Sequence, residues 1–379
     1  MNILFLVKDM EYANGGVCTQ ILTLAKEYIQ SGNKVLLVAE GTDFEEDIHR
    51  IGINYIDDIK MKSVRFNPFS FLLAYKAIRK LVKLNEIDIV HVHTQSALPI
   101  VYLLKKSTGI PYIWTNHIDD IPHPRILKQF HRLMKFPIIS VSESCREDLI
   151  DRFNIDKRYI KVIPNGINLN NFTELSSEER HQLNKEFRID SNNYNICLLS
   201  RVAFNKGHDI LVRAIKLIQQ RGTISNIRLI VAGSMQEKEW YDKEVHSFSE
   251  QNNIELNYVG FRSPRDIFGI ADLFVLPSRK EGFGMVCIEA LAMHCPVVRS
   301  NSPGWNEMVD YARVVKIGDI SALADAIEDA YKNKEKTLKM TEAGFQAVKS
   351  VFNSSAMAES TMNIYKTVIN KEWPNNGEY

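Results

Sequence analysis

The sequence has 379 residues, which is too long for a single ordinary hydrophobic core and suits two domains of roughly 170–200 residues. Its hydrophobic content of 45% and charged content of 25% are typical of a soluble globular protein, and a formal charge of +1 argues against a dedicated nucleic-acid binder. The five cysteines form no C-x-x-C pair, which favours a reducing compartment and buried thiols over disulfides or a zinc site.

The first half of the chain alternates apolar segments with helical patterns. Apolar strands are expected at Ile3–Val7, Lys34–Ala39, Ile89–His93, Tyr112–Thr115, Ile138–Val141 and Ile160–Ile163. Helical periodicity falls between them, over Val17–Ser31, Pro68–Leu84 and Ser142–Phe153. Uninterrupted apolar strands that alternate with helices predict a parallel sheet covered on both faces.

The second half repeats this scheme. Strands are expected at Tyr194–Leu199, Ile227–Val231, Glu255–Tyr258, Asp272–Leu276, Pro296–Val298 and Arg313–Val315. The polar, charged segment Asn168–Asn193 is interpreted as a linker, and the tail from Asp319 is helical in pattern. Open parallel sheets bind ligands beyond the carboxyl ends of their strands, so two facing sheets would leave one cleft between the domains.

The chain begins with an apolar strand, MNILFLV, and has no basic leader. No segment reaches the roughly 18 uninterrupted apolar residues that indicate a spanning helix. We therefore expect no signal peptide, no membrane span and a cytoplasmic location.

The segment Pro277–Leu291, PSRKEGFGMVCIEAL, is the most informative part of the sequence. It predicts a turn that ends at Gly284 and a helix over Met285–His294. The first backbone N–H groups of that helix would be unpaired, and the helix dipole favours an anion there. These N–H groups belong to Gly284, Met285 and Val286.

Two glutamates flank this anion site. Glu281 precedes the helix, and Glu289 lies eight positions further along. A carboxylate close to an anion is useful where it holds uncharged hydroxyl groups. The pattern therefore predicts a site for a nucleotide diphosphate with a sugar at each end.

Two cations, Arg201 and Lys206, follow the strand that ends near Leu199. Cations at the start of a helix oppose its dipole unless an anion is bound there. A departing diphosphate is such an anion, and both side chains would stabilise its developing charge. No Asp-x-Asp metal signature stands in a suitable loop, so Mg²⁺ is not expected. The alternative is a solvated pair of surface cations.

Together these features resemble the signature of retaining glycosyltransferases of the GT-B fold, family 4, also called group 1. Further motifs appear in the order of that family and span nearly the whole chain: NGG at Asn14–Gly16, HVH at His91–His93, PNGIN at Pro164–Asn168, SR at Ser200–Arg201, KG at Lys206–Gly207, VAGS at Val231–Ser234 and VG at Val259–Gly260. The resemblance implies an α/β fold of two Rossmann-like, doubly wound parallel-sheet domains that face each other across a cleft. Residues 1–170 would bind the acceptor, residues 171–353 would bind the nucleotide sugar, and residues 354–379 would return to the first domain.

The resemblance also implies roles for individual residues. His117 would contact the donor sugar near the reacting carbon, Glu281 would hold the donor-sugar hydroxyls, and Glu289 would bind the ribose. The residues expected to act in catalysis are His117, Glu281, Arg201 and Lys206. Those expected to bind substrate are Gly15, Gly16, Asn165, Gly233, Phe261, Arg262, Phe283, Gly284, Met285, Val286 and Glu289. No metal and no cofactor are expected.

The sequence departs from the family pattern at three places. Asn116 and Ile118–Asp120 surround His117 with unusual neighbours, and Met293–Pro296 replaces the usual glycine turn. In RSNSPGWNE, at Arg299–Glu307, Trp305 stands where smaller residues are common. Donor preference could differ at this last segment. His91 and His93 are interpreted as structural or cleft-wall residues.

Two basic segments of the first half contain no acidic residue, Lys60–Lys83 and Arg125–Lys135. In the first, aromatic and leucine side chains are interleaved with the cations. Such a face suits an anionic membrane surface and a lipid-linked acceptor. The alternative is a solvated face over a buried apolar stripe.

The predicted function is retaining, metal-independent transfer of a sugar from a nucleotide-diphosphate donor to the hydroxyl of a glycan or lipid-linked acceptor. A UDP-sugar is favoured over a GDP-sugar, and the expected setting is bacterial cell-surface polysaccharide or glycolipid assembly. The alternatives are a GT-B nucleotide-sugar epimerase and a non-catalytic nucleotide-sugar-binding protein. A dinucleotide oxidoreductase is disfavoured because no G-x-G-x-x-G follows a strand.

Overall fold

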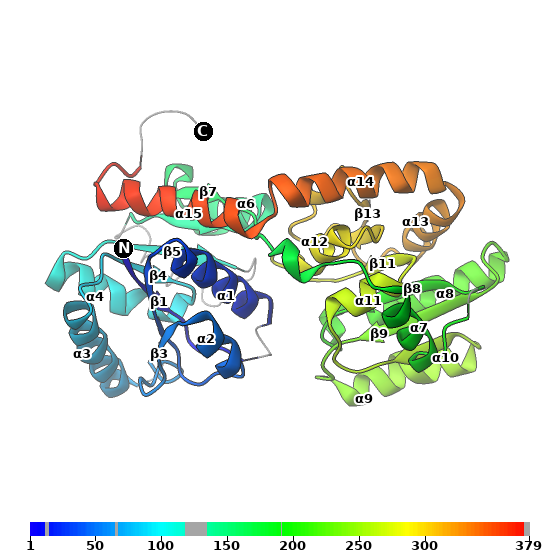
Figure 1. The fold of residues 1–379 in the computed structure, drawn as a ribbon, viewed down its shortest axis with the longest axis horizontal. Coiled ribbons are helices and arrows are strands. Elements are labelled where there is room, and N and C mark those ends of the chain that lie inside the picture. The colour runs from blue at the N-terminus through cyan, green and yellow to red at the C-terminus, as the bar shows by residue number, and fades with distance from the viewer. Residues whose placement is uncertain (12–14, 65–66, 118–134, 191, 375–379) are drawn as a thin grey trace. The chain divides into compact units, whose positions relative to one another are not determined.

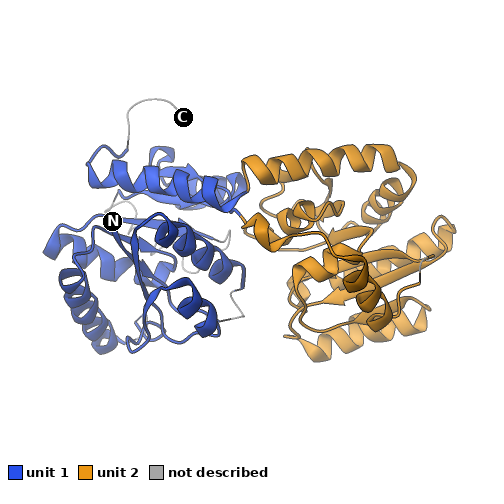
Figure 2. Cartoon of the chain, in the orientation of Figure 1, with its two compact units in different colours: residues 1–166, 353–379 blue, residues 167–352 orange. Residues whose placement is uncertain are grey.

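The computed structural model describes residues 1–11, 15–64, 67–117, 135–190 and 192–374. The chain divides into two compact units (Figure 2). Unit 1 comprises residues 1–166 and 353–379, and unit 2 comprises residues 167–352. Each unit is built around one parallel sheet with helices packed on it (Figure 1), as the alternating pattern of the sequence predicts.

The sheet of unit 1 has seven parallel strands in the order β3-β2-β1-β4-β5-β6-β7. Their bounds are β1 Asn2–Leu6, β2 Lys34–Val38, β3 Asn54–Ile56, β4 Ile89–Val92, β5 Tyr112–Asn116, β6 Ile138–Ser140 and β7 Ile160–Val162. The strands predicted from the sequence correspond to six of these within one or two residues. The seventh, β3, has only three residues and no apolar run, so it left no signal in the sequence.

Successive residues of the unit 1 strands pack into two separate cores, one on each face of the sheet. In β1, Ile3 and Phe5 belong to one core, and Leu4 and Leu6 belong to the other. The first core contains residues of α1 (Gly15–Gln30), α2 (Glu45–Ile51) and α15 (Ser354–Ile369). The second contains residues of α3 (Pro68–Leu84), α4 (Leu98–Thr108) and α6 (Glu143–Phe153). Because both faces are buried, most strand positions are apolar, with exceptions such as His91 on β4 and Thr115 on β5.

Helix α15, near the end of the sequence, completes the core of unit 1. Its Ile364 and Tyr365 are buried in the same core as α1. The Tyr365 hydroxyl lies 2.6 Å from Nδ1 of His91 on β4, and Ser354 Oγ donates to Glu27 on α1 at 2.5 Å. These contacts join α15 to β4 and to α1.

The sheet of unit 2 has six parallel strands in the order β10-β9-β8-β11-β12-β13. The strands are β8 Tyr194–Leu199, β9 Ile227–Ala232, β10 Glu255–Tyr258, β11 Leu273–Leu276, β12 Val297–Ser300 and β13 Arg313–Val315. The helices that follow them include α8 His208–Arg221, α9 Lys238–Tyr241, α10 Ser247–Gln251, α11 Pro264–Ile270, α12 Met285–Ala292, α13 Ile320–Lys332 and α14 Lys334–Ser350.

The order of the unit 2 strands reverses between β8 and β11. These strands pair directly, with Leu273 opposite Ile196 and Phe274 opposite Cys197. The chain leaves β8 toward one side of the sheet and leaves β11 toward the other, so the loops after both strands begin side by side at the carboxyl edge. Ligands of doubly wound sheets bind at such a switch point.

The segment Asn168–Asn193, interpreted from its polarity as a linker, contains helix α7 (Ser177–Glu186). A capping box formed by Ser176 and Glu179 starts this helix, and Arg265 on α11 donates to the Glu179 carboxylate at 2.8 Å. None of its residues is buried, so the helix is stabilised by its cap and by ion pairs rather than by an apolar face. That is why hydrophobic periodicity did not predict it.

Candidate functional site

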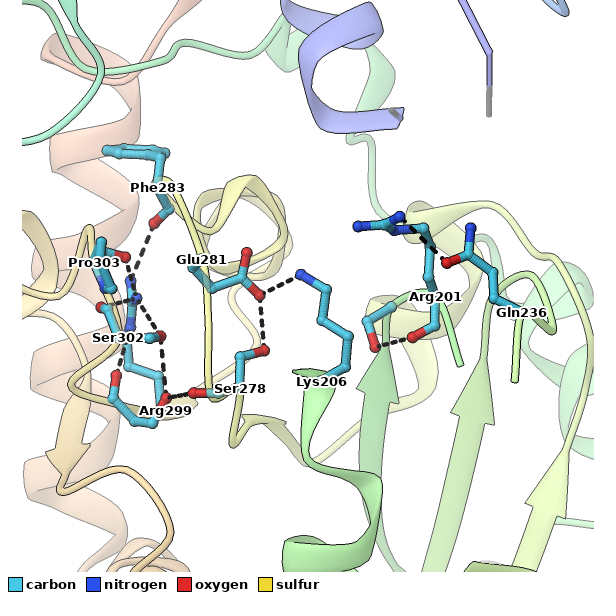
Figure 3. A network of polar contacts seen from close by, with 11 residues as sticks. Arg201, Lys206, Gln236, Ser278, Glu281, Phe283, Arg299, Ser302 and Pro303 are labelled. Carbon is cyan, nitrogen blue, oxygen red and sulfur yellow. Dashed lines mark hydrogen bonds and ion pairs between the residues drawn. The ribbon is translucent and has the colours of Figure 1, made fainter. Parts of the chain in front are cut away.

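An ion pair between Lys206 and Glu281 lies at the switch point of unit 2. Lys206 Nζ is 2.6 Å from Glu281 Oε1, and the two side chains are only 12% and 10% exposed (Figure 3). Ser278 Oγ donates to the same carboxylate oxygen at 2.7 Å. Burial alone would raise the pKa of Glu281, but the charge of Lys206 and these two hydrogen bonds outweigh it and lower that pKa. Glu281 therefore remains ionised.

Arg279 fastens the two loops that carry this pair. Its guanidinium donates to both carboxylate oxygens of Asp209 on α8, at 2.8 and 2.7 Å, and to the carbonyl of Phe204 at 2.7 Å. Its backbone N–H donates to the carbonyl of Asn205 at 2.8 Å. A bidentate guanidinium–carboxylate contact fixes orientation as well as distance. Arg279 thus holds the loop of Lys206 against the loop after β11.

The same loop leads into helix α12, which starts at Met285 as predicted. Gly284 precedes it in the left-handed region, with φ of +86°, and no side chain caps the helix. Within the described part of the chain, the N–H groups of Gly284, Met285 and Val286 make no hydrogen bond. These three donors and the positive end of the helix dipole form an anion-binding arrangement beside the ion pair.

Glu289 lies one helical turn inside α12 and is 9% exposed. No described residue donates a hydrogen bond to its carboxylate, and burial raises its pKa to about 7. A buried carboxylate that lacks donors is costly in the unliganded protein. A ligand that offers two hydroxyl groups would supply the missing donors.

Arg201 and Gly233 are two further predicted site residues of unit 2. Arg201 Nη1 donates to Gln236 at 3.3 Å (Figure 3). At Gly233, a Cβ atom would lie 1.9 Å from the carbonyl oxygen of Ser200, so only glycine allows this approach of the loops after β8 and β9.

Phe261 and Arg262 follow β10. Phe261 is 74% exposed, and Arg262 is engaged by Glu186 of α7 at 2.5 Å rather than by the Lys206–Glu281 pair. Phe283 is buried against Phe352 at the other end of the loop, with ring centroids 6.0 Å apart. Of the predicted residues of unit 2, Lys206 and Glu281 contact each other directly, and the start of α12 follows Glu281 by four positions.

In unit 1, His117 is paired with a histidine that the sequence did not single out as a partner. His117 Nε2 lies 3.1 Å from Nδ1 of His93, and the two rings stack with centroids 5.3 Å apart. Burial lowers the pKa of His117 to about 3, so the imidazole is neutral near pH 7. His91 is held separately, by Tyr365 and by Thr115 at 2.6 Å each. The alternation of His91 and His93 along the chain indicates that both rings lie on one face of the sheet, but it does not pair His93 with His117.

The other predicted residues of unit 1 are Gly15, Gly16 and Asn165. Gly15 and Gly16 begin α1, and the preceding Asn14 lies outside the described residues. Asn165 follows β7 and is buried, and its Oδ1 accepts no hydrogen bond from the described residues.

The described residues were compared with the requirements of a metal site and of a membrane-spanning helix. Within the residues that the structure describes, no group of three or more His, Cys, Asp or Glu side chains could hold a metal ion. No described helix is long and apolar enough to span a bilayer. The basic residues Arg65, Arg125, Lys128 and Arg132 lie outside the described residues, as do Asp119 and Asp120.

Glu289 makes the stability of the unliganded protein depend on pH. Its pKa of about 7 in the folded protein exceeds the ordinary value of 4.5, so the folded state binds a proton more tightly than the unfolded chain. Stability therefore falls as pH rises from about 4.5 toward 7 and stays lowered above 7. Glu289→Gln removes this destabilising charge. We expect it to raise the free energy of unfolding by on the order of 1–3 kcal/mol at pH 8, and by less toward pH 5.

Calorimetric unfolding of the unliganded protein at both pH values measures this gain. The matched control is Glu239→Gln, which changes an exposed glutamate of the same unit. The assignment of a raised pKa to Glu289 would be contradicted if Glu289→Gln were less stable than the wild type at pH 8. It would also be contradicted if the substitution changed the free energy of unfolding equally at both pH values.

Comparison with known proteins agrees with the division of the chain into two units. Residues 179–347 match the family described as Glycosyl transferases group 1, and residues 14–171 match the family described as Glycosyltransferase Family 4. The capsular polysaccharide biosynthesis glycosyltransferase CapM of Staphylococcus aureus is 27% identical over 239 residues, covering 61% of this chain and 62% of CapM.

Two solved structures share the fold over nearly the whole chain. A glycosyltransferase from Rickettsia africae has a TM-score of 0.87 at 22% identity and covers 99% of each chain. Anabaena HepE in complex with UDP-glucose has a TM-score of 0.80 at 20% identity, covering 97% of this chain and 100% of that one. The chain therefore belongs to the group 1 glycosyltransferases of family 4 and has the GT-B fold.

Proposed function

We propose that this glycosyltransferase is a retaining, metal-independent enzyme that transfers a sugar from a nucleotide-diphosphate donor to an acceptor hydroxyl. The observation that carries the proposal is the buried Lys206–Glu281 pair beside the unpaired N-terminus of α12. A diphosphate bound at that N-terminus would have hydrogen-bond donors and cations on one side and carboxylates for sugar hydroxyls on the other.

The charges support this placement. Glu281 already compensates Lys206, so the pair is close to neutral, and the dipole of α12 adds positive potential. Arg201 would add a second cation to a departing diphosphate, and no metal ion would then be required. Glu281 would hold hydroxyls of the donor sugar, and Glu289 would hold those of the ribose.

The surroundings of Glu281 argue against a covalent intermediate. Retaining enzymes that use one need a free carboxylate nucleophile and a second carboxyl group about 5 Å away. Here one carboxylate oxygen of Glu281 is engaged by both Lys206 and Ser278, which lowers its nucleophilicity. In our proposal the leaving phosphate oxygen accepts the proton of the acceptor hydroxyl, on the same face of the sugar. His117, neutral, would contact the donor sugar rather than transfer a proton.

The donor and acceptor can be narrowed by analogy. The HepE complex contains UDP-glucose, and CapM is named for capsular polysaccharide biosynthesis. We propose a UDP-sugar as the donor, with a GDP-sugar as the alternative. The acceptor would be a glycan or lipid-linked glycan bound by unit 1, in the assembly of a bacterial surface polysaccharide or glycolipid.

A membrane-facing surface would lie on α3. Phe69 and Leu73, near its N-terminus, are 68% and 52% exposed, and Lys76, Lys80 and Lys83 are exposed further along. Lys60 and Lys62, in contrast, pair with Glu40 and Glu11. The proposed surface therefore contains fewer of the cations of the basic segment Lys60–Lys83 than the sequence alone suggested.

The two glutamates should be separable by ligand binding. Glu289→Gln should weaken both the donor and the free nucleoside diphosphate, because both contain the ribose. The loss of a hydrogen bond to a charged group predicts a roughly 10- to 150-fold effect. Glu281→Gln should leave the affinity for the free nucleoside diphosphate nearly unchanged and reduce turnover. Calorimetric titration of UDP and GDP into each variant tests this, and equal losses in both variants would show that the two carboxylates are misassigned.

The cations should act on turnover. Arg201→Ala and Lys206→Ala should each reduce turnover on the order of 10²-fold, the effect of removing one charge-stabilising group. The wild-type enzyme should remain active in excess EDTA, measured as release of nucleoside diphosphate with an acceptor. Loss of activity on chelation, restored by Mg²⁺, would refute the metal-independent mechanism.

The α3 surface should bind anionic vesicles. Vesicles with anionic lipid should retain the protein, neutral vesicles should not, and raised salt should release it. Charge reversal at Lys76, Lys80 and Lys83 should weaken binding, whereas reversal at the ion-paired Lys60 should not. Sedimentation with vesicles measures both, and equal binding to neutral and anionic lipid would exclude an electrostatic surface.

A further inference from the structure

Arg299, on β12, is fully buried (0% exposed) although its guanidinium is permanently charged. Among the described residues it has no carboxylate partner. It donates instead to backbone carbonyls, namely those of Phe283 (3.3 Å), Ser300 (3.2 Å), Ser302 (2.9 Å), Pro303 (3.0 Å) and Gly304 (2.9 Å), and to the Ser302 hydroxyl (3.4 Å). Figure 3 shows the contacts with Phe283, Ser302 and Pro303. One buried cation therefore gathers the carbonyls of two loops, the loop that precedes α12 and the loop that follows β12.

This arrangement fixes the direction of the neighbouring N–H groups. In a trans peptide the carbonyl and the N–H point in opposite directions. The carbonyls of Phe283, Pro303 and Gly304 face the guanidinium, so the N–H groups of the next residues point away from it. Those N–H groups belong to Gly284, Gly304 and Trp305, and none of them makes a hydrogen bond within the described chain.

The two loops also touch directly. Gly304 has a φ of +82°, and a Cβ atom there would lie 2.1 Å from the carbonyl oxygen of Phe283. A side chain at this position would strain the backbone and would require the two loops to move apart. Gly304 thus braces the loop after β12 against the loop that starts α12.

The charge of Arg299 acts on the same site. It favours the ionised form of Glu281, after the larger effects of burial, Lys206 and Ser278. Among the described residues, the guanidinium donates only to uncharged oxygen atoms, and no carboxylate within hydrogen-bonding distance supplies a compensating negative charge, which is costly in a protein interior. An anion bound at the start of α12 would provide that charge.

We propose that Arg299 is a positioning residue of the donor site. By holding the carbonyls of both loops, it presents the N–H groups of Gly284, Gly304 and Trp305 to the diphosphate of the donor, and its charge complements that diphosphate. The loop after β12 thereby becomes part of the phosphate site. This inference rests on the proposed function, because the ligand is the donor of that reaction.

The test compares ligands with and without phosphates. Arg299→Met removes the charge and the hydrogen bonds, whereas Arg299→Lys keeps the charge but cannot span both loops. We expect both variants to bind UDP roughly 10- to 100-fold more weakly, the effect of losing one or two hydrogen bonds to a charged group. Binding of uridine, which has no phosphate, should change less than about threefold on the same scale. Calorimetry with UDP and ligand-observed NMR with uridine measure the two affinities, with GDP and guanosine used if the wild type prefers guanine.

Arg313→Met is the matched control. Arg313 lies on the adjacent strand β13 and pairs with Asp329 at 2.6 Å, so its loss should leave the ratio of UDP to uridine affinity unchanged. Gly304→Ala is a second variant for the case in which the Arg299 variants do not fold. Its methyl group should push the two loops apart and weaken UDP selectively.

The outcomes separate the two proposals. Selective loss of UDP in Arg299→Lys or Gly304→Ala supports the positioning role. Wild-type affinity for UDP in both variants overturns that role and leaves the proposed function intact, and equal loss of UDP and uridine shows a structural role only. Failure of the wild type to bind either nucleoside diphosphate overturns the proposed function itself.

Discussion

The contact between the loops after β8 and β11 is the constraint on which the site depends. Those strands are neighbours in the sheet of unit 2, so Lys206 and Glu281 meet although 75 positions separate them in the sequence. Arg279 fixes this meeting from one side by binding Asp209 and the carbonyl of Phe204. The position of the ion pair then follows from strand order rather than from local conformation.

Buried charges and unpaired polar groups destabilise the site in the unliganded protein. Among the described residues, Glu289 is buried without donors, the N–H groups at the start of α12 are unpaired, and Arg299 donates only to backbone carbonyls and the Ser302 hydroxyl. Each arrangement disfavours the empty site and favours a ligand with an anionic centre and hydroxyl groups. Dipoles fixed in this way need not reorganise when charge develops on a leaving group. Lower stability of the unliganded site is the expected consequence of such preorganisation.

Local patterns predicted most of the fold because both faces of each sheet are buried, so nearly every strand is an apolar run. The same reasoning missed β3, which has only three residues, and α7, which buries no residue. The start of α12 was predictable because a glycine turn, a helix and two glutamates stand together in sequence.

The partners of the functional side chains were not predictable in this way. Nothing in the local sequence pairs His117 with His93, or Glu281 with Lys206, since each pair joins separate strands of a sheet. Arg299 appeared in the sequence only as part of a segment that departs from the family pattern. An arginine normally indicates an exposed position, and only the fold shows that two loops surround this one with carbonyl groups.

The most direct test of this account is a crystal structure of the protein with UDP or GDP bound. We predict diphosphate oxygens within hydrogen-bonding distance of the N–H groups of Gly284, Met285 and Val286, with the ribose hydroxyls on the Glu289 carboxylate. A nucleotide whose diphosphate lies elsewhere, for example against Gly15 and Gly16 of unit 1 with the start of α12 left without it, would contradict the account.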